Sequence, residues 1–325
     1  MATCVVVALT AATWQTPAFL TVPPTPAAVT ALGATPPAGP VGERRLQRIA
    51  DSLEAADFPA LEPGLGDLGT ANWAQEVDER VCFDVSESVA GDCVFGRRGA
   101  PRTAVVLGDA FSAAWMGAVL SALPADRYRV HQLTRSQCPA WDVALDPTNA
   151  GAAECAAHRQ WALGEIDKLQ PDLLIISSYH YLGYEIANVG ETDGAVAEAV
   201  GAGLARTLAK IGPATSTVVL APPPGSGNLQ ECATDGGSPE DCVRDIPVLW
   251  SSVARAESAA AEAAGATYVD TSGWFCAERR CPAFIGTTPV TVDGAHISWR
   301  TSTEVGPVLR EALRAAEVVP PASLR

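Results

Sequence analysis

Short apolar runs alternate with longer helical stretches over the last two thirds of the chain, and this alternation constrains the fold more than any other feature. The apolar runs lie at 103–107, 128–133, 171–177, 216–221 and 266–270. Helical stretches at 113–123, 154–169, 194–211 and 246–264 separate them, and a last one at 305–316 follows. Buried parallel strands have this length, and the helices between them must cover both faces of the sheet. The sequence therefore predicts an α/β fold, a three-layer α/β/α sandwich around a central parallel sheet.

The first predicted strand runs into Gly108-Asp109-Ala110 and then a helix. Ligands on parallel sheets bind beyond the carboxyl ends of the strands. The free N–H groups at the start of a helix favour negative charge there, such as the oxyanion of acyl transfer. Gly108 permits a sharp turn and Asp109 can cap the helix. Taken alone, the motif is better explained as an ordinary helix cap.

A second motif, Asp293-Gly-Ala-His296, lies shortly before the last predicted helix. A histidine base needs a partner on its second ring nitrogen, and an aspartate three residues earlier can supply it when the loop curls back. The pattern also occurs by chance in surface loops, but its place in the order of elements favours a catalytic pair. The two motifs together predict a base and its orienting carboxylate, with no serine at the turn.

Eight of the nine cysteines form four close sequential pairs, which leaves Cys4 over. The spacing predicts four local disulfides and an oxidising compartment. Scattered buried thiols in a cytosolic protein are the alternative. With no C-x2-C spacing and only four histidines, we expect no metal site. The predicted pairs are Cys82/Cys93, Cys138/Cys155, Cys232/Cys242 and Cys276/Cys281.

Residues 1–42 contain no charged side chain. Residues 1–20 are mostly apolar, lack the basic start of a signal peptide, and are interrupted by Gln15 and Pro17. The end of a transmembrane helix is the favoured interpretation and a degenerate signal sequence is the second. Residues 21–42 are rich in proline and alanine, as in an extended linker. We expect a helical and disulfide-closed lead-in over 43–101 and the α/β domain over 102–325.

The chain carries a formal net charge of −15 and a pI near 4.6. Nucleic acids and anionic membrane surfaces are themselves negatively charged, so this balance argues against both as partners.

From Cys82 to the C-terminus the sequence resembles the extracytoplasmic SGNH domain of membrane-bound acyltransferase family 3 proteins, which O-acetylate cell-wall and surface glycans. The resemblance implies an SGNH-hydrolase-like fold and an extracytoplasmic domain tethered through its N-terminus. It also implies an acyl donor delivered by a membrane acyltransferase domain, a glycan acceptor and no cofactor. The segments that carry the resemblance are Gly108-Asp-Ala-Phe-Ser-Ala-Ala-Trp115, Cys138-Pro139, Pro171-Asp-Leu-Leu-Ile-Ile176, Trp274-Phe-Cys276 with Cys281-Pro282, and Val292-Asp-Gly-Ala-His296.

By this resemblance the nucleophilic serine belongs at Ala110, with His296 as general base and then acid, and with Asp293 orienting it. An alanine methyl cannot form an acyl ester. We favour an engineered Ser-to-Ala variant over a naturally inactive paralogue. A third possibility is Ser112 as the nucleophile, but two residues further along a helix its Oγ is rotated by roughly 200°.

The oxyanion hole departs from the family pattern, in which a glycine follows the second strand and an asparagine the third. Here Arg135-Ser136-Gln137-Cys138 and Ser177-Ser178-Tyr179-His180 follow those strands. The backbone N–H groups of Ala110 and Gln137 remain candidate donors. Tyr179, together with Tyr181 and Tyr184, either forms a stacking wall for a sugar or covers the sheet end. His180 either contacts substrate or is a structural loop histidine.

Two alternatives to an O-acyltransferase stay open. A secreted carbohydrate esterase of the same fold would pass the acyl group to water instead of a sugar. A non-catalytic glycan-binding domain would keep the fold and need no nucleophile.

Overall fold

A six-stranded sheet forms the centre of the molecule in the structure, a computed structural model that describes residues 34–68, 73–74, 77, 82–233 and 236–319. The strand order is β1-β3-β2-β4-β5-β7. Strands β2, β3, β4, β5 and β7 run parallel, and β1 pairs antiparallel with β3. The strands are β1 (Val94–Phe95), β2 (Arg102–Gly108), β3 (Tyr128–Thr134), β4 (Leu173–Ser177), β5 (Ser216–Leu220) and β7 (Thr267–Val269).

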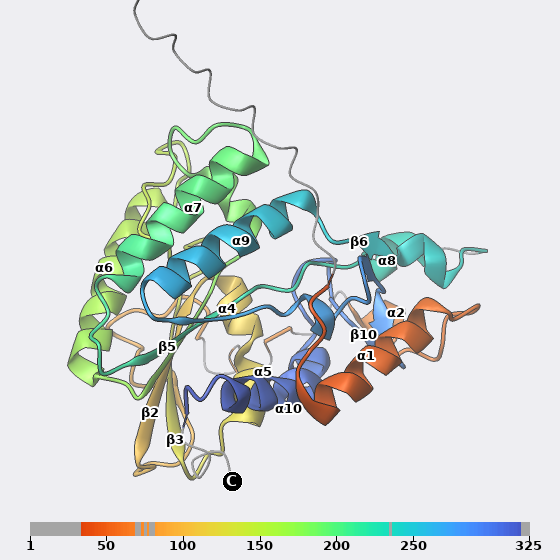
Figure 1. The fold of residues 1–325 in the computed structure, drawn as a ribbon, viewed down its shortest axis with the longest axis horizontal. Helices are drawn as coiled ribbons and strands as arrows, with labels where there is room; N and C mark the ends of the chain where they lie inside the picture. Colours follow the sequence, from red (N-terminus) through yellow and green to blue (C-terminus); the bar gives the residue numbers. More distant parts are fainter. Residues whose placement is uncertain (1–33, 69–72, 75–76, 78–81, 234–235, 320–325) are drawn as a thin grey trace, which may run out of the picture.

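Helices cover both faces of this sheet (Figure 1). The chain leaves β2 for β3 in one direction and then crosses back to β4, β5 and β7. Because parallel crossovers are right-handed, connections in opposite directions lie on opposite faces. Helices α6, α7 and α9 therefore share one face, where α7 contacts α9, and α5 lies on the other, against α10. The three-layer sandwich predicted from the alternation is confirmed.

The α-helices and short 3-10 helices (η) occupy the following ranges. The α-helices are α1 (Gly39–Leu53), α2 (Leu65–Leu68), α4 (Ala110–Ala114), α5 (Met116–Ala122), α6 (Ala152–Leu169), α7 (Asp193–Leu208), α8 (Leu229–Cys232), α9 (Val248–Ala263) and α10 (Trp299–Ala315). The 3-10 helices are η1 (His180–Glu185), η2 (Pro239–Cys242) and η3 (Ser272–Trp274).

Two small sheets and a second apolar cluster lie beside the main core. Strand β6 (Arg244–Asp245) pairs with β8 (Arg280–Cys281), and β9 (Phe284–Ile285) pairs with β10 (Thr288–Pro289). Phe284 packs there with Leu68 and Leu229, so α2 and α8 close over β9. These two-residue strands are too short to leave a period in the sequence, and we did not predict them.

Two predicted helices differ from the observed ones. The last helix begins at Trp299 rather than 305, because Ser298 caps it by accepting a hydrogen bond from the N–H of Thr301. The helix predicted over 113–123 begins earlier, at Ala110, and is divided at Trp115 into α4 and α5. In both cases the N-cap residue, not the apolar pattern, sets the start.

All four predicted disulfides are present: Cys82–Cys93, Cys138–Cys155, Cys232–Cys242 and Cys276–Cys281. The apolar segment 1–20 and Cys4 lie outside the described residues. Helices in the described ranges are too short or too polar to cross a bilayer. At the end of the predicted linker, Thr35 bonds Ser272 and Asp270, and α1 packs on α10.

Candidate active site

The turn after β2 brings Asp109 and Ala110 to the carboxyl edge of the sheet. Gly108 has a φ of 146°, and a Cβ there would lie 1.9 Å from the carbonyl oxygen of Ser177 and 2.4 Å from Oγ of Ser112. Only glycine therefore lets β2 approach β4 this closely before the chain turns into α4.

Asp109 is buried, with 1% of its surface exposed, and it joins two loops. Its Oδ1 accepts the N–H of Phe111 at 2.8 Å, and its Oδ2 accepts the N–H of Tyr179 at 2.7 Å. Burial raises the pKa of Asp109 to about 6, although the two backbone N–H groups and His296 act against this rise. The carboxylate thus fixes the turn after β2 to the turn after β4.

Ala110 is the first residue of α4, so its N–H lies ahead of the first helical hydrogen bond. Its partly exposed side chain lines a cavity of about 660 Å³. Ser112 lies elsewhere: its side chain is fully buried, and Oγ is 2.6 Å from the carbonyl oxygen of Ser177 and 3.0 Å from that of Leu107. The hydroxyl of Ser112 therefore faces the sheet and cannot reach a ligand in the cavity.

Asp293 and His296 occupy one tight loop at the same cavity. Oδ2 of Asp293 lies 2.8 Å from Nδ1 of His296, while Oδ1 accepts the backbone N–H groups of His296 and Ala295 at 2.7 and 2.9 Å. Gly294, with a φ of 87°, lets the loop curl back. Burial would raise the pKa of Asp293, but the hydrogen bonds from His296 and Ala295 outweigh it and lower that pKa. An ionised Asp293 holds the imidazole by Nδ1 and leaves Nε2 for proton transfer.

Aromatic rings enclose His296. Trp73 stacks on the imidazole with ring centroids 4.5 Å apart, and Phe111 lies at 4.6 Å on a tilt. Phe111 in turn stacks on Tyr179 at 4.0 Å. These ring contacts fix the orientation of the imidazole in the cavity. Trp73 and Phe111 could not be recognised as site residues from the sequence, because nothing local marks an aromatic residue as a neighbour of a distant histidine.

The cavity collects residues from five separated segments of the chain. No arginine or lysine belongs to the described lining, whereas Asp109 and Glu185 contribute carboxylates. The lining comprises Trp73, Asp109, Ala110, Phe111, Ser136, Gln137, Thr148, Asn149, Tyr179, Leu182, Glu185, Ala295 and His296.

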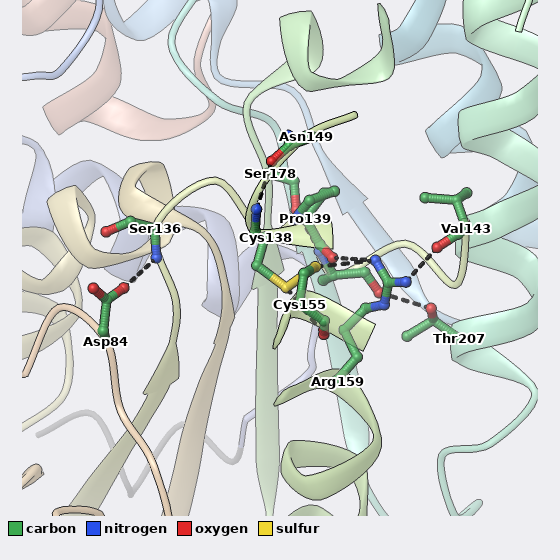
Figure 2. The surroundings of a disulfide bond; sticks show 12 residues. Asp84, Ser136, Cys138, Pro139, Val143, Asn149, Cys155, Arg159, Ser178 and Thr207 are labelled. Carbon is green, nitrogen blue, oxygen red and sulfur yellow. Dashed lines mark hydrogen bonds between the residues drawn. A yellow bond between two sulfur atoms is a disulfide. The ribbon is translucent and has the colours of Figure 1, made fainter. Parts of the chain in front are cut away.

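Gln137 lies in the loop after β3 with a φ of 55°, an uncommon conformation for a residue with a side chain. Its two neighbours hold it there. The N–H of Ser136 donates to Asp84 at 2.7 Å, and Cys138 is joined by a disulfide to Cys155 of α6 (Figure 2). The loop therefore holds Gln137 in the lining of the cavity.

Arg159 of α6 holds the next part of this loop, residues 139–143, by hydrogen bonds. Its guanidinium is largely buried and donates to the carbonyl oxygens of Pro139 and Val143 (Figure 2). Further along the same loop, Thr148 and Asn149 reach the cavity. One braced loop thus supplies both ends of a cavity wall.

Tyr179 reaches the cavity, but His180 does not. Burial and the nearby Tyr181, Asp293 and Asp109 raise the pKa of Tyr179 to about 12, so its phenol stays neutral. The ring of His180 is 1% exposed and its Nε2 lies 3.0 Å from Oε2 of Glu257 on α9. The structure therefore gives His180 the place of a buried structural histidine.

Metal ligands do not gather anywhere in the described ranges: no three histidine, cysteine, aspartate or glutamate side chains there form a group that could hold an ion.

The sequence and the fold were compared with known proteins. Residues 78–311 match the sequence profile of the family described as the SGNH domain (fused to AT3 domains). Among solved structures, the periplasmic domain of a lipopolysaccharide acetyltransferase from Salmonella ser. Paratyphi A superposes with a TM-score of 0.56 at 16% identity, covering 76% of this chain and 97% of that one. Est24, a carbohydrate acetylesterase from Sinorhizobium meliloti, gives a TM-score of 0.41 at 17% identity over 66% of this chain and 99% of that one. No curated protein sequence matches.

Proposed function

Because this chain belongs to the family of SGNH domains fused to AT3 domains, we propose that it is the acyl-transferring domain of a carbohydrate O-acyltransferase whose nucleophile position is occupied by Ala110. The observation that carries the proposal is the Asp293–His296 pair, with 2.8 Å between Oδ2 and Nδ1, at the cavity that Ala110 lines. The acyl group, which we take to be acetyl, would come from a membrane acyltransferase domain.

A serine at position 110 completes the mechanism. Nε2 of His296 takes the proton of the serine hydroxyl as Oγ attacks the acyl carbonyl. The N–H groups of residue 110 and Gln137 stabilise the oxyanion. The leaving group departs with the proton, and the acyl group remains as a serine ester. A sugar hydroxyl then attacks this ester, gives its proton to His296 and leaves as the acylated sugar, while the serine regains its proton. With Ala110 no ester forms.

We place the domain outside the cytoplasm. Four disulfides persist in an oxidising compartment and would be reduced in the cytosol. This location also puts the cavity on the side of the membrane where surface glycans lie.

Restoring the hydroxyl tests the proposal directly. We expect Ala110→Ser to hydrolyse p-nitrophenyl acetate at least about a hundredfold faster than the Ala110 chain, because the intact triad acts as a unit. Ala110→Gly, which changes the same position without adding a hydroxyl, is the matched control and should stay inactive. In the serine variant, His296→Ala should abolish the gain, and intact mass should reveal an acylated protein.

The products decide between the enzymatic alternatives. Acylated glycan as the main product, when a glycan acceptor is present, supports the transferase; release to water alone identifies an esterase of the same fold. An Ala110→Ser variant that folds but turns over no acyl ester would contradict both and leave a glycan-binding domain.

A further inference from the structure

Two tyrosines close to the cavity keep much of their surface exposed to solvent. Tyr181 and Tyr184, both on η1, have 43% and 41% of their surface exposed, and they are the exposed aromatic side chains of the described chain. Exposed aromatic faces next to a cavity are typical of ligand contacts.

The exposed rings continue the aromatic lining of the cavity. Tyr179 lies 5.3 Å from Tyr181, and Tyr181 lies 6.4 Å from Tyr184, measured between ring centroids. At its inner end Tyr179 stacks on Phe111, which contacts His296. We call Tyr179, Tyr181 and Tyr184 the tyrosine row. With Phe111, the row forms a continuous series of ring contacts from His296 to the exposed rings of Tyr181 and Tyr184.

The row is held in place before any ligand arrives. The N–H of Tyr179 is fixed to Asp109, and the hydroxyl of Tyr184 donates to Oδ1 of Asp193 at 2.5 Å. Between them, the buried pair of His180 and Glu257 anchors η1 to α9. Binding to such rings costs little conformational entropy.

The charges around the row exclude an anionic ligand. The described cavity lining contains carboxylates and no arginine or lysine, and Asp193 lies at the outer end of the row. A uronate or phosphate chain would meet the carboxylates of Glu185 and Asp193 and find no cation in the described lining. A neutral sugar ring meets no such penalty, and its C–H face packs on an aromatic face.

We propose that the tyrosine row is the acceptor subsite of this domain and binds an uncharged glycan of several sugar units by stacking on successive rings; this inference rests on the acyl-transfer function proposed above. The sugar that reaches Tyr179 lies nearest to residue 110 and presents its hydroxyl there. Sugars further along the chain bind Tyr181 and Tyr184 and supply affinity.

Binding to the Ala110 chain tests the subsite without turnover. The probes are the neutral hexasaccharides of β-1,4-glucan, β-1,4-linked N-acetylglucosamine and α-1,4-glucan, their monosaccharides, and hexagalacturonate, measured by calorimetry. We expect at least one neutral hexasaccharide to bind at least tenfold more tightly than its monosaccharide and than hexagalacturonate. The double variant Tyr181→Ala/Tyr184→Ala should lose at least tenfold in affinity, whereas the matched variant Tyr181→Phe, which keeps the ring, should bind like the parent.

The possible outcomes distinguish failure of the acceptor subsite from failure of the proposed acyl transfer. Absence of binding by every neutral hexasaccharide, equal binding by the double alanine variant, or tighter binding of hexagalacturonate overturns the subsite. An inactive Ala110→Ser variant with tyrosine-dependent binding overturns the acyl transfer and keeps the row as a glycan-binding surface.

Discussion

Asp109 is a buried carboxylate, and each of its two oxygens accepts a backbone hydrogen bond. It accepts one N–H from its own helix and one from the loop after β4. A neutral side chain could not accept both bonds at once with the same strength. The raised pKa of Asp109, about 6, measures how costly the charge is at this place.

That raised pKa gives the protein a pH dependence with a definite sign. The folded state holds the proton more tightly than the unfolded chain, whose pKa is 3.8. The stabilisation is therefore complete below about pH 4 and is lost as the pH rises through about 6. Relative to Asp109→Asn, which does not titrate, the parent should lose about 2 kcal/mol of unfolding free energy between pH 4 and pH 7. Urea denaturation of both proteins at several pH values measures this difference, and a constant difference would contradict it.

Gly108 shows how strictly the same turn is defined. A Cβ at this position would meet Ser177 and Ser112 well inside contact distance. We expect Gly108→Ala to lower the free energy of unfolding by at least about 3 kcal/mol or to prevent folding. The matched control is Gly164→Ala in the exposed face of α6, where a Cβ meets nothing within 4 Å; it should stabilise by about 0.5–1 kcal/mol. Thermal or urea unfolding of both variants measures these changes, and equal changes in the free energy of unfolding would contradict the special role of Gly108.

The loop between β3 and α6 is the element on which the candidate oxyanion hole depends. It carries Gln137 in a left-handed conformation and is tied down by Asp84, by Arg159 and by the disulfide to Cys155. The disulfide is adjacent to Gln137 in sequence, so losing it releases one side of the turn.

Removal of this disulfide should therefore affect catalysis as well as stability. Replacing Cys138 and Cys155 by serine removes a link across 17 residues, which we expect to cost about 3 kcal/mol. In the Ala110→Ser background it should also lower kcat at least about tenfold, because the oxyanion donor is no longer held. The matched control replaces Cys232 and Cys242, which lie in the second apolar cluster. That control should lose similar stability and keep its kcat; equal kcat values in both variants would contradict the role of the loop.

Seen as a whole, the molecule follows its sequence closely where the determining contacts are local or periodic. The strands and helices follow from apolar runs, and the four disulfides from cysteines at most 17 residues apart. Ala110, Gln137, Tyr179 and His296 were all selected from the sequence, and all line one cavity. Each follows a strand or precedes the last helix, and the topology of a parallel sheet gathers such positions at one edge. Their catalytic roles remain predictions.

Contacts between distant segments could not be predicted from the sequence. Nothing near Trp73 indicates that its ring stacks on His296, more than 200 residues away. Nothing near His180 reveals Glu257 as its buried partner. Such pairs depend on how helices pack on the sheet, and packing leaves no period in the chain. The same reason hides Glu311, whose carboxylate accepts the N–H groups of Val41 and Gly42 at the start of α1.

The side chain of Glu257 contacts two loops that each supply a wall of the cavity. Its Oε1 accepts the indole N–H of Trp141, from the loop that carries Gln137, and its Oε2 contacts His180, from the loop that carries Tyr179. A substitution that shifts α9 would displace the wall that carries Gln137 and the wall that carries Tyr179 together. Under the proposed function, a substitution in α9 is therefore expected to change acceptor binding and catalytic rate together.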